Sequence, residues 1–123
     1  MTHSLTPYLS RTISDDAGLS VSTILKALPN GWVTTFNTLI MEIDDISPSS
    51  IVKLDIKNGV LYLSVCEQTK YKQLITLVVR ALSQESARTC MVCGIPGIRR
   101  KEQEHKPCLC RVHYLEFINY TEE

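Results

Sequence analysis

The sequence has no hydrophobic run approaching the roughly 18 to 20 residues that a membrane-spanning helix needs, which argues against a transmembrane protein. The first residues, MTHSLTPYLSRTISDDAG, lack a basic stretch followed by an apolar one, so we expect no secretory signal. Neither sign of charge is in excess, because 13 Lys and Arg balance 13 Asp and Glu. A neutral chain has no general attraction to nucleic acid or anionic lipid. We therefore expect a cytoplasmic protein without a membrane partner.

The familiar motifs of catalysis are missing as well. The chain has no nucleophile elbow, no phosphate-binding loop and no histidine–carboxylate group outside its cysteine-rich segment. The paired acids Asp15-Asp16 and Asp44-Asp45 lie beside expected loops, where such pairs are usually solvated. We therefore predict that the protein is not an enzyme.

The domain organisation that the sequence predicts is simple. Residues 1–17 are polar and aperiodic, and we expect a flexible N-terminal tail there. Residues 18–123 contain no repeat and no low-complexity linker, and a chain of this length with 44% hydrophobic residues can form one core. We expect a single domain over residues 18–123, which includes a zinc module over residues 88–118.

Three segments have the pattern of helices. LSVSTILKAL predicts a short helix with Ser20 or Ser22 as its N-cap, ended by Pro29-Asn30-Gly31. WVTTFNTLIMEIDDI predicts a longer one, whose apolar residues Phe36, Leu39, Ile40 and Ile43 share one face. TKYKQLITLVVRALSQESART predicts a third, with an apolar stripe formed by Tyr71, Leu74, Ile75, Val78, Ala81 and Leu82.

A β-hairpin is predicted between the second and third helices. Apolar and polar residues alternate on both sides of Asn58-Gly59, a dipeptide that favours the type I′ turn of a two-residue hairpin. The predicted fold class is therefore α+β, with two or three helices packed on a small antiparallel hairpin or sheet.

The segment CMVCGIPGIRRKEQEHKPCLCRVH, residues 90 to 113, holds four of the five cysteines and two of the three histidines. Cys90 and Cys93 form one chelating pair, and Cys110 and His113 form a second pair after 16 intervening residues. In the cytoplasm such cysteines stay reduced and are available to metal. The spacing predicts a structural Cys₃His zinc site in a C-terminal zinc-ribbon-like or treble-clef-like knuckle, which RVHYLEFINY would continue as a helix.

Other interpretations of these residues are open. Cys90 and Cys93 could form a redox CxxC pair, although such motifs open a helix and this one follows a helix. Catalytic zinc is disfavoured, because four protein ligands leave no position for water. Cys108 or His105 could replace a predicted ligand, but we expect Cys108 to be a spare or outer-shell thiol and His105 a surface residue of the loop. We expect Cys66 to be a small buried hydrophobe.

The order of these features resembles a family of small bacterial proteins, often of unknown function, that end in a zinc knuckle. Its members have Gly-Trp at the start of an amphipathic helix, a β-hairpin, a helix ending in a serine-containing stretch, and the motif CxxCGxPG…LCxxH. The matching parts here are Gly31-Trp32, the hairpin at Asn58-Gly59, ALSQESARTCMVCGIPG and LCRVH. The chain departs from the family in a less charged hairpin and in HKPCLC before the last ligands. The resemblance implies a zinc-stabilised α+β domain and carries no activity with it.

Without catalytic residues, the chain is most consistent with a binding protein. We expect an intracellular inhibitor or immunity protein, in which zinc gives a small domain the rigidity to bind and neutralise a toxin or defence enzyme. If that target is a nuclease, acidic groups such as Asp44, Asp45, Asp55 or Glu67 could mimic phosphate. The alternative is a nucleic-acid-binding or transcriptional regulator that contacts phosphate through Arg99, Arg100, Lys101, Lys106 and Arg111. A subunit of a larger complex is a third possibility.

Overall fold

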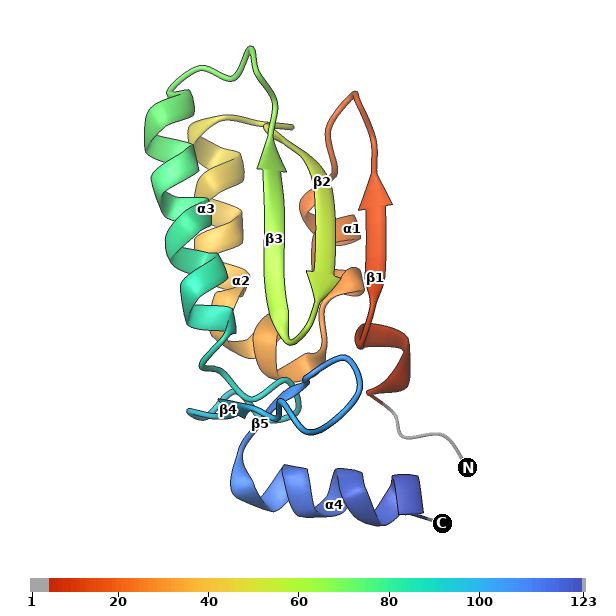
Figure 1. The fold of residues 1–123 in the computed structure, drawn as a ribbon. Helices are drawn as coiled ribbons and strands as arrows, with labels where there is room; N and C mark the ends of the chain where they lie inside the picture. The colour runs from red at the N-terminus through yellow and green to blue at the C-terminus, as the bar shows by residue number, and fades with distance from the viewer. Residues whose placement is uncertain (1–4, 123) are drawn as a thin grey trace.

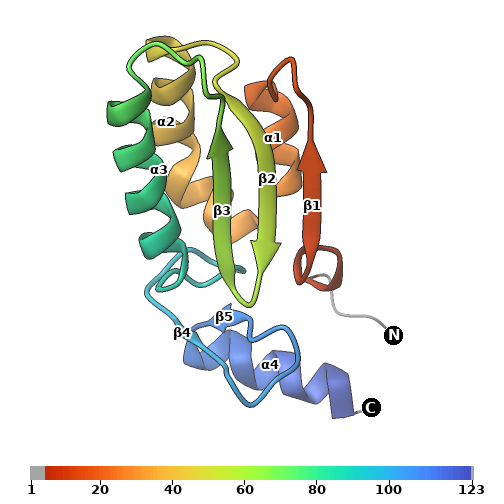
Figure 2. The ribbon, with the colours of Figure 1, turned by 45° about the horizontal axis from the view of Figure 1, so that its top comes forward.

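The computed structural model describes residues 5 to 122, and these form an α+β fold as predicted (Figure 1). A three-stranded sheet lies in front of three helices, and a small C-terminal region packs at one end of them (Figures 1 and 2). The elements in chain order are η1 (Thr6–Tyr8), β1 (Arg11–Ser14), α1 (Val21–Ala27), α2 (Asn30–Ile46), β2 (Ile51–Lys57), β3 (Val60–Val65), α3 (Lys72–Ser86), β4 (Ile98–Arg99), β5 (Cys108–Leu109) and α4 (Arg111–Glu122).

The predicted hairpin is confirmed and forms two thirds of the main sheet. Asn58 and Gly59 have φ values of 54° and 76°, as a type I′ turn requires, and they pair β2 with β3 in antiparallel register. One face of the sheet is buried against the helices, and the other face is polar. Leu54, Ile56 and Leu61, all at most 1% exposed, lie on the inner face and form the centre of the core.

The third strand of this sheet comes from the segment expected to be a flexible tail. Residues Arg11 to Ser14 form β1, which pairs antiparallel with β2, and Leu5 is buried in the core. The prediction of a tail is therefore wrong for residues 5 to 17, and residues 1 to 4 lie outside the described residues. This strand is stabilised by backbone hydrogen bonds to β2, which do not depend on the identity of the side chains. Because β1 has only four residues and most of them are polar, the sequence shows no hydrophobic alternation that would predict a strand there.

The three predicted helices are present, but one of them buries a different face than expected. Ser20 caps α1 by accepting a hydrogen bond from the Thr23 N–H, and α2 buries Phe36, Ile40 and Ile43 as predicted. In α3 the buried residues are Ile75, Val79, Leu82 and Ser86. The predicted stripe of α3 was therefore wrong in part, because Tyr71, Leu74 and Ala81 face solvent. The apolar arc of α3 is wider than the area that β3 and α2 cover.

The C-terminal region also follows the prediction. β4 and β5 form an antiparallel pair within the segment that joins the two predicted ligand pairs, and α4 begins at Arg111. We call residues 88 to 118 the knuckle. In the part of the chain that the structure describes, no helix is both long enough and apolar enough to cross a membrane.

Candidate metal centre

The structure brings all four predicted ligands together. Cys90, Cys93, Cys110 and His113 offer ligand atoms that all lie within 4.8 Å of one another. The Sγ atoms of Cys93 and Cys110 are 3.8 Å apart, and His113 Nδ1 lies 3.2 Å from Cys110 Sγ and 3.7 Å from Cys90 Sγ. A tetrahedral zinc ion would place two sulfurs about 3.8 Å apart and a sulfur and a nitrogen about 3.6 Å apart. The donor set and its dimensions therefore fit one four-coordinate metal ion.

Two short segments position these ligands. Cys90 and Cys93 lie in the turn that follows α3, which closes when the Gly94 N–H donates to the Cys90 carbonyl oxygen. Cys110 directly precedes α4, and His113 lies in the first turn of that helix. Cys110 and His113 thus lie at the positive end of the α4 dipole, which favours the thiolate form of Cys110 over the thiol.

The electrostatics of the cysteines point to a cationic ligand. Burial opposes ionisation of Cys90, but N–H groups of Cys110, Cys93 and Val92 donate to its sulfur and lower its pKa to about 7. Burial raises the pKa of Cys93 to about 11, and the nearby Cys90 charge adds to this increase. Ionisation of one of these sulfurs therefore disfavours ionisation of the other, and a divalent cation bound between them would stabilise both thiolates.

The knuckle is docked on the start of α2 through the Gly-Trp dipeptide. The Gly31 N–H donates to the Met91 carbonyl oxygen, and a Cβ on Gly31 would lie 2.1 Å from the Cys90 carbonyl oxygen. Trp32 is fully buried and donates its indole N–H to the Thr89 carbonyl oxygen at 3.0 Å. The approach of two backbones explains why a glycine is needed at residue 31. Sequence reasoning treated this dipeptide only as part of a resemblance and missed its role beside the metal centre.

The loop between the two ligand pairs is held by its arginines. Arg99 donates to the carbonyl oxygen of Asn58 at the tip of the hairpin. Arg100 donates through Nε and Nη2 to the carbonyl oxygen of Leu109, and its guanidinium lies 4.4 Å from the centre of the Tyr114 ring. Tyr114 also hydrogen-bonds Glu102, which lowers the pKa of that carboxyl. These contacts attach the loop to both the main sheet and α4.

Cys66, Cys108 and His105 are not part of the four-residue cluster. Cys108 is buried and donates to the Ala87 carbonyl oxygen, and burial raises the pKa of its thiol to about 12. His105 is exposed on the loop, as expected. Cys66 is only half-buried beyond the end of β3, so the prediction of a buried hydrophobe is wrong there. None of the five cysteines forms a disulfide.

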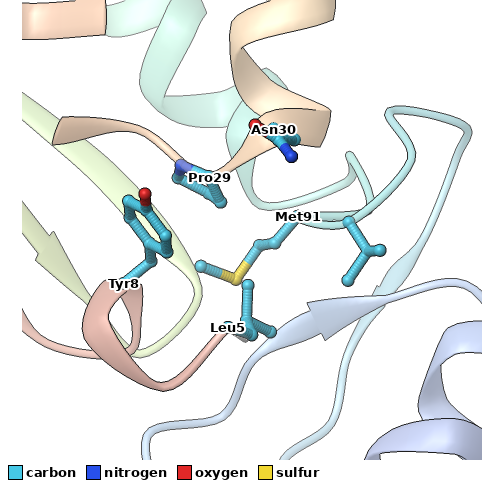
Figure 3. A pocket seen from close by; sticks show the side chains of 6 residues that line it. Leu5, Tyr8, Pro29, Asn30 and Met91 are labelled. Carbon is cyan, nitrogen blue, oxygen red and sulfur yellow. The ribbon is translucent and has the colours of Figure 1, made fainter. Parts of the chain in front are cut away.

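A hollow lies directly beside the metal centre. Met91 and Val92, which separate Cys90 from Cys93, line a space of about 250 Å³ together with Leu5, Tyr8, Pro29 and Asn30 (Figure 3). A second hollow of about 690 Å³ shares Tyr8 and Asn30 with the first and continues along α1 past Lys26. We call the two together the knuckle groove. Its lining residues include no carboxylate, cysteine or histidine.

Comparison with known proteins gives no identification. The chain matches no protein-family model, no curated protein and no solved structure. The resemblance to small bacterial proteins with a zinc knuckle therefore stays a prediction. The class that the fold and the site define is an α+β domain with a candidate Cys₃His metal centre.

Proposed function

We propose that Cys90, Cys93, Cys110 and His113 bind one Zn²⁺ ion with a structural role. The support is the donor set, because thiolate and imidazole at tetrahedral spacing suit zinc better than calcium or magnesium. Four protein ligands leave no coordination position for a substrate or a reactive water. The ion would supply the rigidity that the short strands of the knuckle lack. Reduced thiolates of this kind are typical of a cytoplasmic protein.

We propose further that the chain is a non-catalytic protein-binding module. The observation that carries this proposal is the position of the knuckle groove. Met91 and Val92 lie between two ligands and form part of its wall, so a bound metal would fix the shape of the groove. The lining combines apolar side chains with the polar groups of Tyr8, Ser22, Lys26 and Asn30, which suits a short segment of another protein that carries both apolar and polar residues. Lys26 on the lining favours an acidic residue in that segment.

The partner that we propose is a toxic or defence enzyme, which would make this chain an inhibitor or immunity protein. Such a protein needs a rigid domain with one specific surface and no chemistry of its own, and the zinc-stabilised knuckle would supply that rigidity.

Binding of nucleic acid is the less well-supported candidate. Arg99 and Arg100 are both half-buried and donate to carbonyl oxygens of the chain itself, which makes them less available to phosphate. Lys101 and Arg111 stay exposed and Lys106 is half-buried, but three cations in a neutral chain give a weak electrostatic footprint.

The test is recovery of the partner from the native host at moderate and at high salt, followed by rebinding with purified components. We expect one protein that resists high salt, rebinds the metal-loaded chain and fails to rebind the metal-free chain. Lys26→Glu should weaken rebinding roughly tenfold by reversing the charge on the groove. Lys53→Glu, an exposed lysine on the polar face of the sheet, is the matched control and should have no effect. Recovery of nucleic acid that dissociates as salt rises would instead support the regulator.

A further inference from the structure

The outer face of α3 carries an apolar stripe that nothing in the described chain covers. Tyr71, Leu74 and Leu77 are 55%, 48% and 60% exposed, and Ala81 is exposed on the same side. The opposite side of α3 buries Ile75, Val79 and Leu82 in the core. In both ribbon views α3 is at the outer edge of the molecule (Figures 1 and 2). We call Tyr71, Leu74, Leu77 and Ala81 the α3 stripe.

The helical spacing of the α3 stripe is that of a helix–helix contact. Residues 74, 78, 81 and 85 follow each other at intervals of three and four, so they form one seam along α3, and Tyr71 directly precedes this helix as its N-cap residue. Val78 is half-buried within this seam, and Leu77 flanks it. The seam therefore has apolar side chains over nearly its whole length and a single acid, Glu85, at its C-terminal end.

The two ends of the stripe complement each other in size and in charge. Tyr71, at the N-terminal end, is the largest side chain of the stripe, and Ala81, near the C-terminal end, is the smallest. Lys70 lies beside the Tyr71 ring, with its Nζ 5.2 Å from the ring centre. Glu85 pairs with Arg88, but both side chains stay more than half exposed, so the carboxylate is accessible.

We propose that the α3 stripe binds the same stripe of a second copy of this chain in antiparallel orientation. A two-fold axis between Thr76 and Leu77 would place Tyr71 of each copy beside Ala81 of the other, and Lys70 of each copy within one helical turn of Glu85 of the other. A parallel pair would instead bring Lys70 beside Lys70 and Glu85 beside Glu85, and like charges repel each other. The antiparallel contact is isologous and closes as a dimer. It is independent of the metal centre and of the knuckle groove.

Sedimentation equilibrium of the full-length, metal-loaded protein at about 100 µM tests this proposal, because dimer formation depends on concentration. The expected mass is twice the 13.9 kDa of one chain. Leu77→Glu should give the monomer mass, because it introduces a charge at the axis. Leu115→Glu, at an equally exposed leucine of α4, is the matched control and should stay dimeric. Far-UV circular dichroism and metal content of both variants should equal those of the wild type.

Charge reversal at the ends of the stripe decides the orientation. Lys70→Glu and Glu85→Lys should each weaken the dimer several-fold, since each places like charges together, and the double variant should regain the wild-type affinity. A wild-type protein that stays monomeric would overturn the proposal, and a different protein would then have to cover the stripe. A dimer that tolerates Leu77→Glu, or a double variant that is no better than the single ones, would overturn it as well.

Discussion

Residues 5 to 86 and residues 88 to 118 of this chain are held together in different ways. The first region has three paired strands and three helices around a continuous core that includes Trp32, Leu54, Ile56 and Ile75. The knuckle has two strands of two residues each, and much of its buried side-chain set consists of cysteines. A region with so little regular secondary structure of its own needs a further source of stability, and metal coordination would add to the burial of Met91, Leu109 and Phe117 in the shared core.

The comparison also shows where the two regions depend on each other. Gly31 and Trp32 of α2 contact the backbone of the knuckle, and Arg99 of the knuckle contacts the tip of the hairpin. The sheet-and-helix region thus supplies a preformed platform, and the metal ion would order the knuckle on it. Stability of the two regions should therefore be separable by experiment, with the metal acting on one and the core on the other.

Removal of the metal should have the largest effect. We expect chelation, or Cys110→Ala, to abolish protection from hydrogen exchange in residues 88–118, since structural zinc sites of small domains contribute roughly 10 kcal/mol or more. Amides of Leu54 and Ile56 should stay protected, because both lie in β2, which pairs with β1 and β3 and not with the knuckle. Hydrogen exchange followed by mass spectrometry measures both regions in one experiment. Loss of protection in the main sheet at the same chelator concentration would contradict the separation.

Gly31→Ala should detach the knuckle from its platform. The new Cβ would lie 2.1 Å from the Cys90 carbonyl oxygen, so the backbone that carries the first ligand must move. We expect a metal affinity at least tenfold lower, measured by competition with a chromophoric chelator. Thr38→Ala, at an exposed residue of the same helix, is the control and should bind metal as the wild type does.

Trp32→Phe should have an intermediate effect on both regions. The phenyl ring keeps most of the buried volume but leaves the Thr89 carbonyl oxygen without the indole N–H that donates to it. A buried unpaired acceptor costs about 1–3 kcal/mol, so we expect that loss in the free energy of unfolding by urea. The loss should be smaller in the metal-free protein, where the knuckle no longer presents this carbonyl to Trp32. An equal loss in both forms would show that the bond does not connect the two regions.

Arg100→Lys should have the smallest effect and should be confined to the knuckle. Lysine keeps the charge but cannot donate two hydrogen bonds to the Leu109 carbonyl oxygen or stack its head group on Tyr114. We expect a loss of about 1 kcal/mol, measured as faster hydrogen exchange in residues 98–109 of the metal-loaded protein. Unchanged exchange there would show that Arg100 contributes nothing measurable to the order of the loop.

The sequence was sufficient to predict what local spacing determines and insufficient for what tertiary packing decides. The ligand set follows from two short chelating pairs, and the hairpin follows from Asn58-Gly59, so both could be predicted. β1 could not, because a polar edge strand is stabilised by its pairing with β2. The buried face of α3 was missed because a wide apolar arc does not indicate which part another element covers. The roles of Gly31 and Trp32 depend on contacts with residues about 60 positions away.

The most direct test of this account is to measure the metal bound by the purified protein. Elemental analysis should give one zinc ion per chain, and X-ray absorption at the zinc edge should give three sulfur neighbours near 2.3 Å and one nitrogen near 2.0–2.1 Å. Cys110→Ala should lose the metal, whereas Cys108→Ala should keep it, because Cys108 lies outside the four-residue cluster. A wild-type protein purified without metal under reducing conditions, or one whose zinc survives Cys110→Ala, would contradict the central claim.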